Sequence, residues 1–171
     1  MDNKMTRKEL MRLMPANGAD VPAAILIVKL GHPSVIPVMR DMIRWMRVAE
    51  CPVADEFAEF FGRLGASAVP VIAEGLMREN CWLRYRIFTR VLPAWPSDLV
   101  RELSTTLNMI VTQPDAYDND IRSAALLIKH HLADLRWLTG WIAFKKDRIA
   151  DRSQLLQQIE SEMRSFQQPK D

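Results

Sequence analysis

The stretch LGHPSVIPVM at residues 30–39 decides the fold, because it returns, one residue shorter, as LGASAVPVI at residues 64–72. Each copy follows one apolar helical pattern and begins another, and the copies lie about 33–34 residues apart, an interval typical of helical repeats. Helix pairs repeated at this interval usually stack into a solenoid, which presents an extended surface to its surroundings. The repeat therefore predicts the architecture, and it indicates a function that depends on a surface.

The composition predicts one folded domain spanning residues 1–171. Hydrophobic residues make up 49% of the chain and charged residues 26%, which excludes disorder for most of it. The presence of only 6 glycines disfavours a turn-rich all-β fold. The net charge is +2, and acidic and basic residues are interleaved, so no basic stripe indicates a nucleic-acid groove.

The sequence does not indicate export or membrane insertion. Residues 1–14 alternate charged and apolar residues, unlike a secretory leader, and apolar stretches such as 23–28 are far too short to span a bilayer. Cys51 and Cys81 lie at expected helix starts beside apolar residues, which favours buried thiols over a disulfide. We therefore expect a cytoplasmic protein with no membrane span.

Capping residues predict where the helices begin and end. Thr6 and Glu9 have the spacing of a capping box, and Gly31 and Gly65 mark helix ends. Further helix starts are expected where a side chain can accept a hydrogen bond from the first turn: Asp20, Ser34, Ser67, Asn80, Ser97, and Asp118 or Asp120.

Apolar residues follow these starts at helical spacing, and no β-like alternation of useful length occurs. The chain is therefore predicted to be all-α, with about eight or nine helices joined by short loops. Antiparallel helix pairs with a repeated junction predict either an α-solenoid or a compact layer of helical hairpins. Gly140 is expected to kink or end the long helix that carries Ile121 to Leu135.

Residues 45–54, WMRVAECPVA, resemble the hallmark of a bacterial family that is numbered 5071 among the domains of unknown function. Its members typically show a Trp, a short acidic linker and then Trp-Pro-Val-Ala. Downstream, Gly65, Pro70 and the segment ENCWLRY at residues 79–85 are similar to the family's progression of Gly, Pro, acidic residue and Trp-Lys-Tyr.

The resemblance covers residues 20–131 and implies a HEAT-like, all-helical core with no known activity. Cys51 stands where the family usually has Trp, and Arg84 where it often has Lys. Residues 132–171 lie beyond the resemblance and are expected to form a C-terminal helical extension.

The titratable residues do not predict a reaction centre. His130 and His131 would point about 100° apart on a helix, so they cannot both face one metal ion, and a solvated surface is expected for them. Asp115, Asp118 and Asp120 lack the glycine and the bidentate Glu of a calcium loop. No nucleophile motif or phosphate loop occurs. We therefore expect no enzyme, no catalytic residue, no metal site and no cofactor.

The segment WLRYR at residues 82–86 is the strongest candidate for a binding surface. On a helix, Trp82, Tyr85 and Arg86 share one face, and these residue types dominate binding hot spots. The alternative is that both rings form a second buried face of a central helix, with the arginines paired to Glu79 or to other carboxylates.

Two further sets of candidates are expected to contribute to partner binding. Trp45 would add an aromatic anchor, while Arg40, Arg44 and Arg47 recur at helical spacing and could meet an acidic partner.

The segment LRWLTGWIAFKK at residues 135–146 combines aromatic rings with a basic end. This composition fits docking on a membrane surface, and it equally fits a helix that seals the end of a solenoid. We favour the sealing role.

These features predict a protein–protein binding domain. Small helical domains of this kind occur beside secreted toxins, so we expect an immunity or antitoxin-type protein that neutralises a partner bacterial toxin by direct binding. One alternative is a HEAT-like nucleic-acid-binding module or base-repair enzyme, whose basic residues would converge on one concave face: Arg40, Arg44, Arg47, Arg84, Arg86 and Arg90. Another is a non-catalytic scaffold subunit that oligomerises through its C-terminal aromatic segment.

Overall fold

The computed structural model describes residues 5–78 and 80–167, with their side chains except at residue 156 and residues 160–167. Every regular element in this described part is helical, and it contains no strand, which confirms the prediction of an all-α protein. The chain divides into two compact units, Met1–Leu132 (unit 1) and Ala133–Asp171 (unit 2).

Unit 1 contains nine α-helical segments in its described residues. They are α1 (Arg7–Leu13), α2 (Val21–Leu30), α3 (Met39–Trp45), α4 (Pro52–Leu64), α5 (Val69–Met77), α6 (Cys81–Arg86), α7 (Ser97–Glu102), α8 (Ser104–Val111) and α9 (Asn119–Lys129). Only Leu103 separates α7 from α8, so the two form one interrupted helix. With α10 (Leu135–Gln167) of unit 2, the described residues hold nine helices counted in this way, within the expected number.

Four short segments join these helices. Three are 3-10 turns, η1 (Ile36–Val38), η2 (Gly65–Ala68) and η4 (Leu92–Ala94). The fourth, η3 (Ile87–Val91), is a π-helical turn that continues directly from α6. A π turn widens a helix by one residue, and such turns often occur near functional sites.

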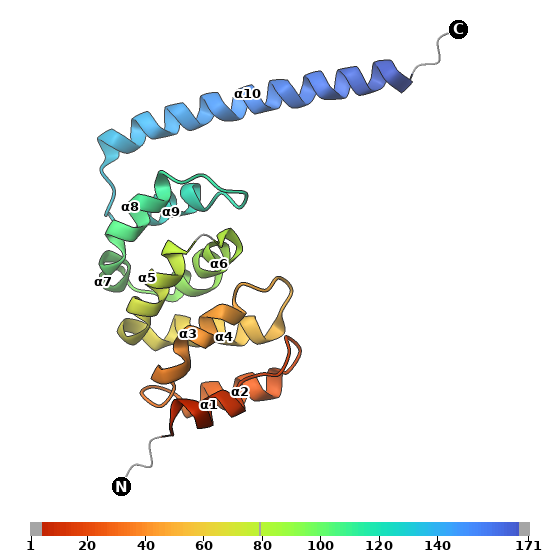
Figure 1. The fold of residues 1–171 in the computed structure, drawn as a ribbon. Coiled ribbons are helices and arrows are strands. Elements are labelled where there is room, and N and C mark those ends of the chain that lie inside the picture. The colour runs from red at the N-terminus through yellow and green to blue at the C-terminus, as the bar shows by residue number, and fades with distance from the viewer. Residues whose placement is uncertain (1–4, 79, 168–171) are drawn as a thin grey trace. The chain divides into compact units, whose positions relative to one another are not determined.

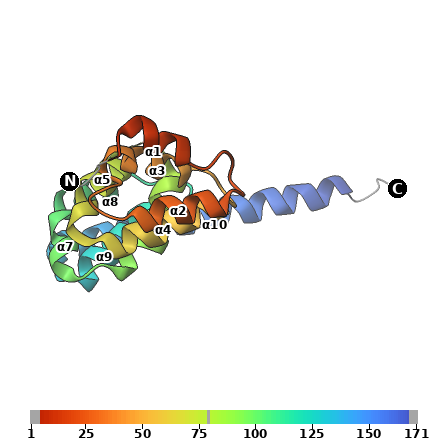
Figure 2. The ribbon, with the colours of Figure 1, turned by 90° about the horizontal axis from the view of Figure 1, so that it is seen from below.

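The helices of unit 1 pack in two rows (Figures 1 and 2). In one row α3 packs against α5 and α5 against α8, while in the other α2 packs against α4, α4 against η3 and η3 against α9. Contacts between α1 and α2, α3 and α4, and α8 and α9 join the rows. The chain thus proceeds as successive helix pairs from α1–α2 at one end to α8–α9 at the other (Figure 1).

Helix α4 supplies the centre of the core. Phe57 and Phe61 are fully buried, and the backbone carbonyl of Phe61 accepts a hydrogen bond of 3.2 Å from Nε1 of buried Trp95. Burying one side chain of this size contributes about 1.5–3 kcal/mol to folding. The buried face of α4 therefore fixes the position of the neighbouring α6–η3 segment, which carries the candidate site.

Several predicted helix starts are confirmed by their hydrogen bonds. Thr6 and Glu9 form a complete capping box at α1. Asp20 accepts a hydrogen bond of 3.4 Å from the amide of Ala23 at α2, and Asn80 accepts one of 2.7 Å from the amide of Leu83 at α6. These local rules hold because each cap needs only residues within one turn of itself.

The two copies of the repeated phrase have the same backbone signature. Gly31 follows α2 with φ 63° and Gly65 follows α4 with φ 68°, conformations that favour glycine over residues with a side chain. A 3-10 turn then precedes the next α-helix in both copies. The prediction that Ser67 caps α5 is wrong, because Ala68 occupies the N-cap position and no side chain caps the helix.

The expected roles of Ser97 and His130 are also wrong. Pro96 occupies the N-cap of α7, and the Ser97 hydroxyl instead lies 2.8 Å from Nδ1 of His130. His130 is buried, whereas His131 is exposed as expected, and both follow α9, which ends at Lys129. Tertiary packing between segments 33 residues apart produced this arrangement.

The start of α9 differs from expectation as well. Asp118 occupies the N-cap position, but its side chain accepts no hydrogen bond from the first turn, and Asp120 is buried within that turn. Asp115 caps the turn instead, because its Oδ1 accepts hydrogen bonds from the amides of Tyr117 at 3.0 Å and Asn119 at 3.3 Å.

Unit 2 is built on α10, a helix of 33 residues. It runs through Gly140 without interruption, so the expectation that this glycine ends the helix is wrong. One glycine costs a helix only about 1 kcal/mol relative to alanine, an amount that the remaining turns can offset.

Both cysteines are free, Cys51 buried and Cys81 half-buried. One stretch of the described residues, Pro52–Met77, reaches a mean hydropathy of 1.2, the level of a possible membrane span. It comprises α4, η2 and α5, and Gly65 interrupts it with a positive φ. Its core packing accounts for the apolar character, so the described residues contain no clear membrane span.

Candidate functional site

The candidate site is built on α6, whose inner face is fixed in the core. Leu83 and Ile87 are fully buried, and Gly75 of α5 approaches closely enough that an added Cβ would lie 3.1 Å from Cδ1 of Ile87. With these residues inward, the helix turns Trp82 and Tyr85 to the opposite face, where both remain half-buried.

Three aromatic rings meet on this face. Trp82 and Tyr85 stack with their ring centroids 5.2 Å apart and an interplanar angle of 27°. Tyr117, from the loop between α8 and α9, contacts both rings, at 5.2 Å from Trp82 and 5.5 Å from Tyr85. These separations lie in the favourable range for aromatic pairs, so the three rings form one cluster.

The loop that carries Tyr117 is tied to α6 by hydrogen bonds. The side-chain amide of Asn119 donates to the carbonyl of Cys81 at 2.8 Å and to Oδ2 of Asp115 at 2.8 Å. Buried Arg84 donates through Nε to the carbonyl of Leu76 at 2.8 Å, and its Nη1 lies 3.9 Å from Asp115. The third ring is therefore held in place by groups on three separate segments.

Two guanidinium groups lie over the aromatic rings. Cζ of Arg86 is 5.6 Å from the centroid of Trp82, and Cζ of Arg122, on α9, is 4.8 Å from that of Tyr85. Arg122 also donates a hydrogen bond of 3.2 Å from Nε to the carbonyl of Tyr117. We call Trp82, Tyr85, Tyr117, Arg86 and Arg122 the aromatic–arginine cluster.

A pocket of about 470 Å³ opens beside this cluster. Trp82, Tyr85 and Arg86 line it on one side, and Thr89 and Arg90 extend the wall along η3. Glu50, from the loop before α4, and Asp55, on α4 itself, supply carboxylates. Two arginines and two carboxylates give the lining no net charge.

Arg86 is the most unusual residue of the pocket. Its side chain is only 7% exposed, and its Nη2 lies 4.0 Å from Oδ1 of Asp55, beyond hydrogen-bonding distance. Its Nη1 and the Nε1 of Trp82 are buried and have no hydrogen-bond partner among the described residues. A buried donor without an acceptor costs about 1–3 kcal/mol, and more when it is charged.

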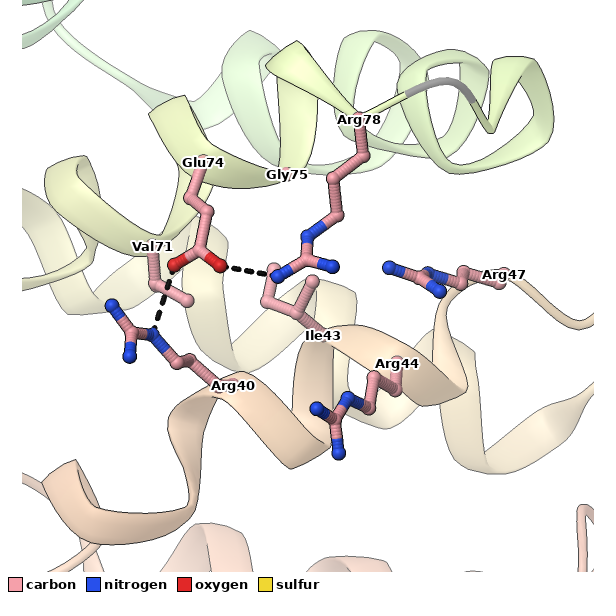
Figure 3. A pocket seen from close by; sticks show the side chains of 8 residues that line it. All are labelled: Arg40, Ile43, Arg44, Arg47, Val71, Glu74, Gly75 and Arg78. Carbon is pink, nitrogen blue, oxygen red and sulfur yellow. Dashed lines mark hydrogen bonds and ion pairs between the residues drawn. The ribbon is translucent and has the colours of Figure 1, made fainter.

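The upstream arginines form a separate basic group between α3 and α5 (Figure 3). Arg40 and Arg78 both pair with Glu74, the former through Nε at 2.9 Å from Oε2. Arg44, on α3, and Arg47, in the turn after it, line the same hollow (Figure 3). The hollow between these side chains has no room for a water-sized ligand, so we regard the group as a charged surface.

Carboxylates partly neutralise this basic group. The hydrogen bond from Arg78, with the charge of Arg40, holds the pKa of Glu74 below its ordinary value of 4.5. Asp41, on α3, pairs with Arg44 at 3.0 Å and with Arg7 at 2.9 Å. The basic group therefore has fewer free charges than the sequence suggests.

The structure brings some of the predicted site residues together and separates others. Trp82, Tyr85 and Arg86 line the pocket beside the aromatic–arginine cluster. Arg40, Arg44 and Arg47 belong to the separate basic group between α3 and α5. Trp45, the last residue of α3, is half-buried, and no ring contact of the described residues includes it.

Sequence reasoning missed Tyr117 and Arg122 because it considered the polar residues around them only for helix capping and for a calcium loop. An aromatic residue inside an otherwise polar loop was the available signal. Asp55 and Glu74 were missed because their partners are 31 and 34 residues away in the chain.

The described residues contain no group of three or more His, Cys, Asp or Glu side chains that could hold a metal ion. Comparison with protein-family models, with curated proteins and with solved structures found no match to this chain. The resemblance to family 5071 thus stays a prediction, and the function must be argued from the geometry.

Proposed function

We propose that this protein binds another protein through the aromatic–arginine cluster and the neighbouring basic group. The observation that carries the proposal is the meeting of three half-buried rings and two guanidinium groups on one surface. Trp, Tyr and Arg are the residues most enriched among binding hot spots, and rings already held by packing lose little entropy on binding.

The arrangement of helices supports a surface of this kind. We propose that the two rows of unit 1 form a HEAT-like solenoid, in which each helix pair contacts its neighbours and one edge is left for a partner. Within the class of binding proteins we propose an immunity or antitoxin-type protein that acts in the cytoplasm and covers the active surface of a bacterial toxin. Stoichiometric binding, without a reaction centre, would be sufficient for this function.

The proposal can be tested by affinity capture followed by a growth assay. Wild-type protein should retain a stoichiometric partner from cells that express it naturally, and that partner should arrest growth when expressed alone. Co-expression of the wild type should restore growth. A partner that is harmless alone contradicts the antitoxin role, and it leaves protein binding as such intact.

Matched variants test the location of the interface. Trp82→Ala and Tyr85→Ala should each weaken binding by about 2 kcal/mol or more, a loss of at least about 30-fold in affinity. Met109→Ala removes an apolar side chain on α8 that is 44% exposed and lies outside the pocket, so it should change affinity less than about twofold. Equal affinities for all three variants would overturn the assignment of the surface.

The nucleic-acid alternative is less well supported by the surroundings of its arginines. Arg84 and Arg86 are buried, and Arg40 and Arg44 are paired with carboxylates. We therefore expect no salt-dependent binding to a DNA or RNA oligonucleotide. Binding that weakens steeply between 50 and 200 mM salt, about as a multi-phosphate contact does, would favour this alternative instead.

A second candidate function, a scaffold subunit that oligomerises, is favoured by α10. Large apolar side chains are exposed along this helix: Leu135, Trp137, Ile142, Phe144, Ile149, Leu155 and Ile159. Surfaces of this kind often mark interaction sites. Light scattering on the full chain and on residues 1–131 tests it, because a scaffold requires the full chain to be the larger oligomer. Monomers in both cases contradict it.

A further inference from the structure

Two residues that line the pocket, Trp82 and Arg86, carry hydrogen-bond donors that lack acceptors. Nη1 of Arg86 and Nε1 of Trp82 are both buried without a partner, and the guanidinium lies 5.6 Å from the centroid of the indole ring. Arg86 is 93% buried, so its orientation is set by packing. An acceptor that enters the pocket would lie beside the two residues that carry these donors.

The volume and charge of the pocket restrict what that group can be. About 470 Å³ is enough for one large side chain and its solvation shell, and too little for a structured segment of polypeptide. An ionised carboxylate only accepts hydrogen bonds, and it matches the planar fork of a guanidinium. Glu50 and Asp55, in the same lining, oppose groups with more negative charge, such as a phosphate dianion.

We propose that this pocket receives the carboxylate of an Asp or Glu side chain from the protein partner, held by Arg86 and Trp82. The inference rests on the proposed function, since it names the chemistry by which that same surface recognises its partner. Glu50 and Asp55 then fit a basic residue beside the acidic one. The pocket thus selects a surface of mixed charge and disfavours a uniform polyanion.

Asp55 would compete with the carboxylate of the partner for Arg86. It is 55% exposed and stands 4.0 Å from Nη2, too far for a hydrogen bond and close enough to repel an incoming carboxylate. Asp55→Asn removes this charge at a solvated position, where the substitution leaves the core untouched. The variant should therefore bind a carboxylate more tightly than the wild type does.

The test uses the full chain labelled with ¹⁵N and follows the indole N–H resonance of Trp82, assigned by its loss in Trp82→Phe. The probes are N-acetyl-glutamate methylamide and the uncharged N-acetyl-glutamine methylamide. The glutamate probe should shift the resonance saturably, and the glutamine probe should bind about tenfold more weakly, because hydrogen bonds to charged groups are the stronger ones.

Three variants show whether Arg86 is responsible. Arg86→Lys should weaken the glutamate probe at least about fivefold, because the fork is lost while the charge is kept. Asp55→Asn should strengthen it about threefold, the size of an exposed charge effect. Arg101→Gln, which removes an exposed charge on α7 outside the pocket, should leave it unchanged. If Arg86→Lys fails to fold, tighter binding in Asp55→Asn beside unchanged binding in Arg101→Gln still decides the question.

Several outcomes would overturn the proposal. Equal binding of the two blocked amino acids, or no movement of the Trp82 resonance, would show that the pocket does not take a carboxylate. Tighter binding of inorganic phosphate or of free succinate would assign it to a phosphorylated group or to a small metabolite. If the captured partner is lost in Trp82→Ala but the probes fail to discriminate, the proposed function stands and only this inference fails.

Discussion

His130 shows how a single buried residue can make folding depend on pH. Burial lowers its pKa below the ordinary value of 6.5, and the charges of Lys129 and His131 act in the same direction. Its Nδ1 pairs with Ser97, while Nε2 is buried without a partner among the described residues. The folded chain therefore binds a proton at His130 less readily than the unfolded chain does.

The stabilisation from neutral His130 is complete above pH 6.5 and is lost as the pH falls toward the lowered pKa of the folded state. We expect the melting temperature of the wild type to fall between pH 7.5 and pH 5.5. His130→Gln should flatten this dependence, whereas His32→Gln, at an exposed loop position, should keep the wild-type slope. A slope that persists in His130→Gln would assign the effect to another group.

Asn80 shows the energetic weight of one capping side chain. Its hydrogen bond to the amide of Leu83 starts the helix that carries Trp82 and Tyr85. Asn80→Ala should lower the free energy of unfolding by about 1 kcal/mol. Ser67→Ala is the matched control, because no side chain caps α5 and its loss should cost less than about 0.5 kcal/mol. Urea denaturation measures both, and equal losses would contradict the cap assignments.

At the scale of elements, the two glycines of the repeated phrase are the points at which helices turn. Gly65 has φ 68° and ψ −139°, a conformation that a residue with a side chain adopts only at a cost. Gly65→Ala should therefore destabilise unit 1 by about 1–3 kcal/mol.

Gly140, unlike Gly65, lies inside a helix, α10, and nothing lies within 4 Å of an added Cβ. Gly140→Ala should increase helicity and stabilise α10 by about 0.5–1 kcal/mol. Thermal unfolding followed by circular dichroism compares the two variants. A neutral Gly65→Ala would show that the turn after α4 adapts to a side chain.

The elements also show what the sequence could and could not predict. The ends at Gly31 and Gly65 and the caps at Thr6 and Asn80 were predictable, because they depend on neighbours within a few residues. The π turn η3 and the 3-10 turns have no comparable local signal. They pack against helices elsewhere in the chain, η3 against α4 and α9 and η1 against α1 and α3.

The site was predictable only in part for the same reason. The shared face of Trp82, Tyr85 and Arg86 follows from helical spacing alone. Tyr117 joins them because hydrogen bonds from Asn119 and Arg84 bring a loop across about 30 residues of chain. Such contacts depend on the whole fold, and spacing rules do not describe them.

For the whole molecule, the division into Met1–Leu132 and Ala133–Asp171 predicts how the chain tolerates truncation. The buried apolar residues of α1–α9 form a core of their own. We expect a protein ending at Leu132 to unfold cooperatively, and to bind the glutamate probe as the full chain does. Broad, non-cooperative unfolding of the shortened chain, measured by calorimetry, would contradict this independence.

The position of Tyr117 late in the chain determines when, during synthesis, the aromatic–arginine cluster is complete. The cluster draws on α6, on the loop before α9 and on Arg122, so its last contributor is synthesised about 40 residues after its first. A nascent chain that has emerged only as far as α8 has two of the three rings and no complete surface. Under the proposed function, a partner would therefore be engaged only after residue 122 has left the ribosome, and the early helices would fold before binding begins.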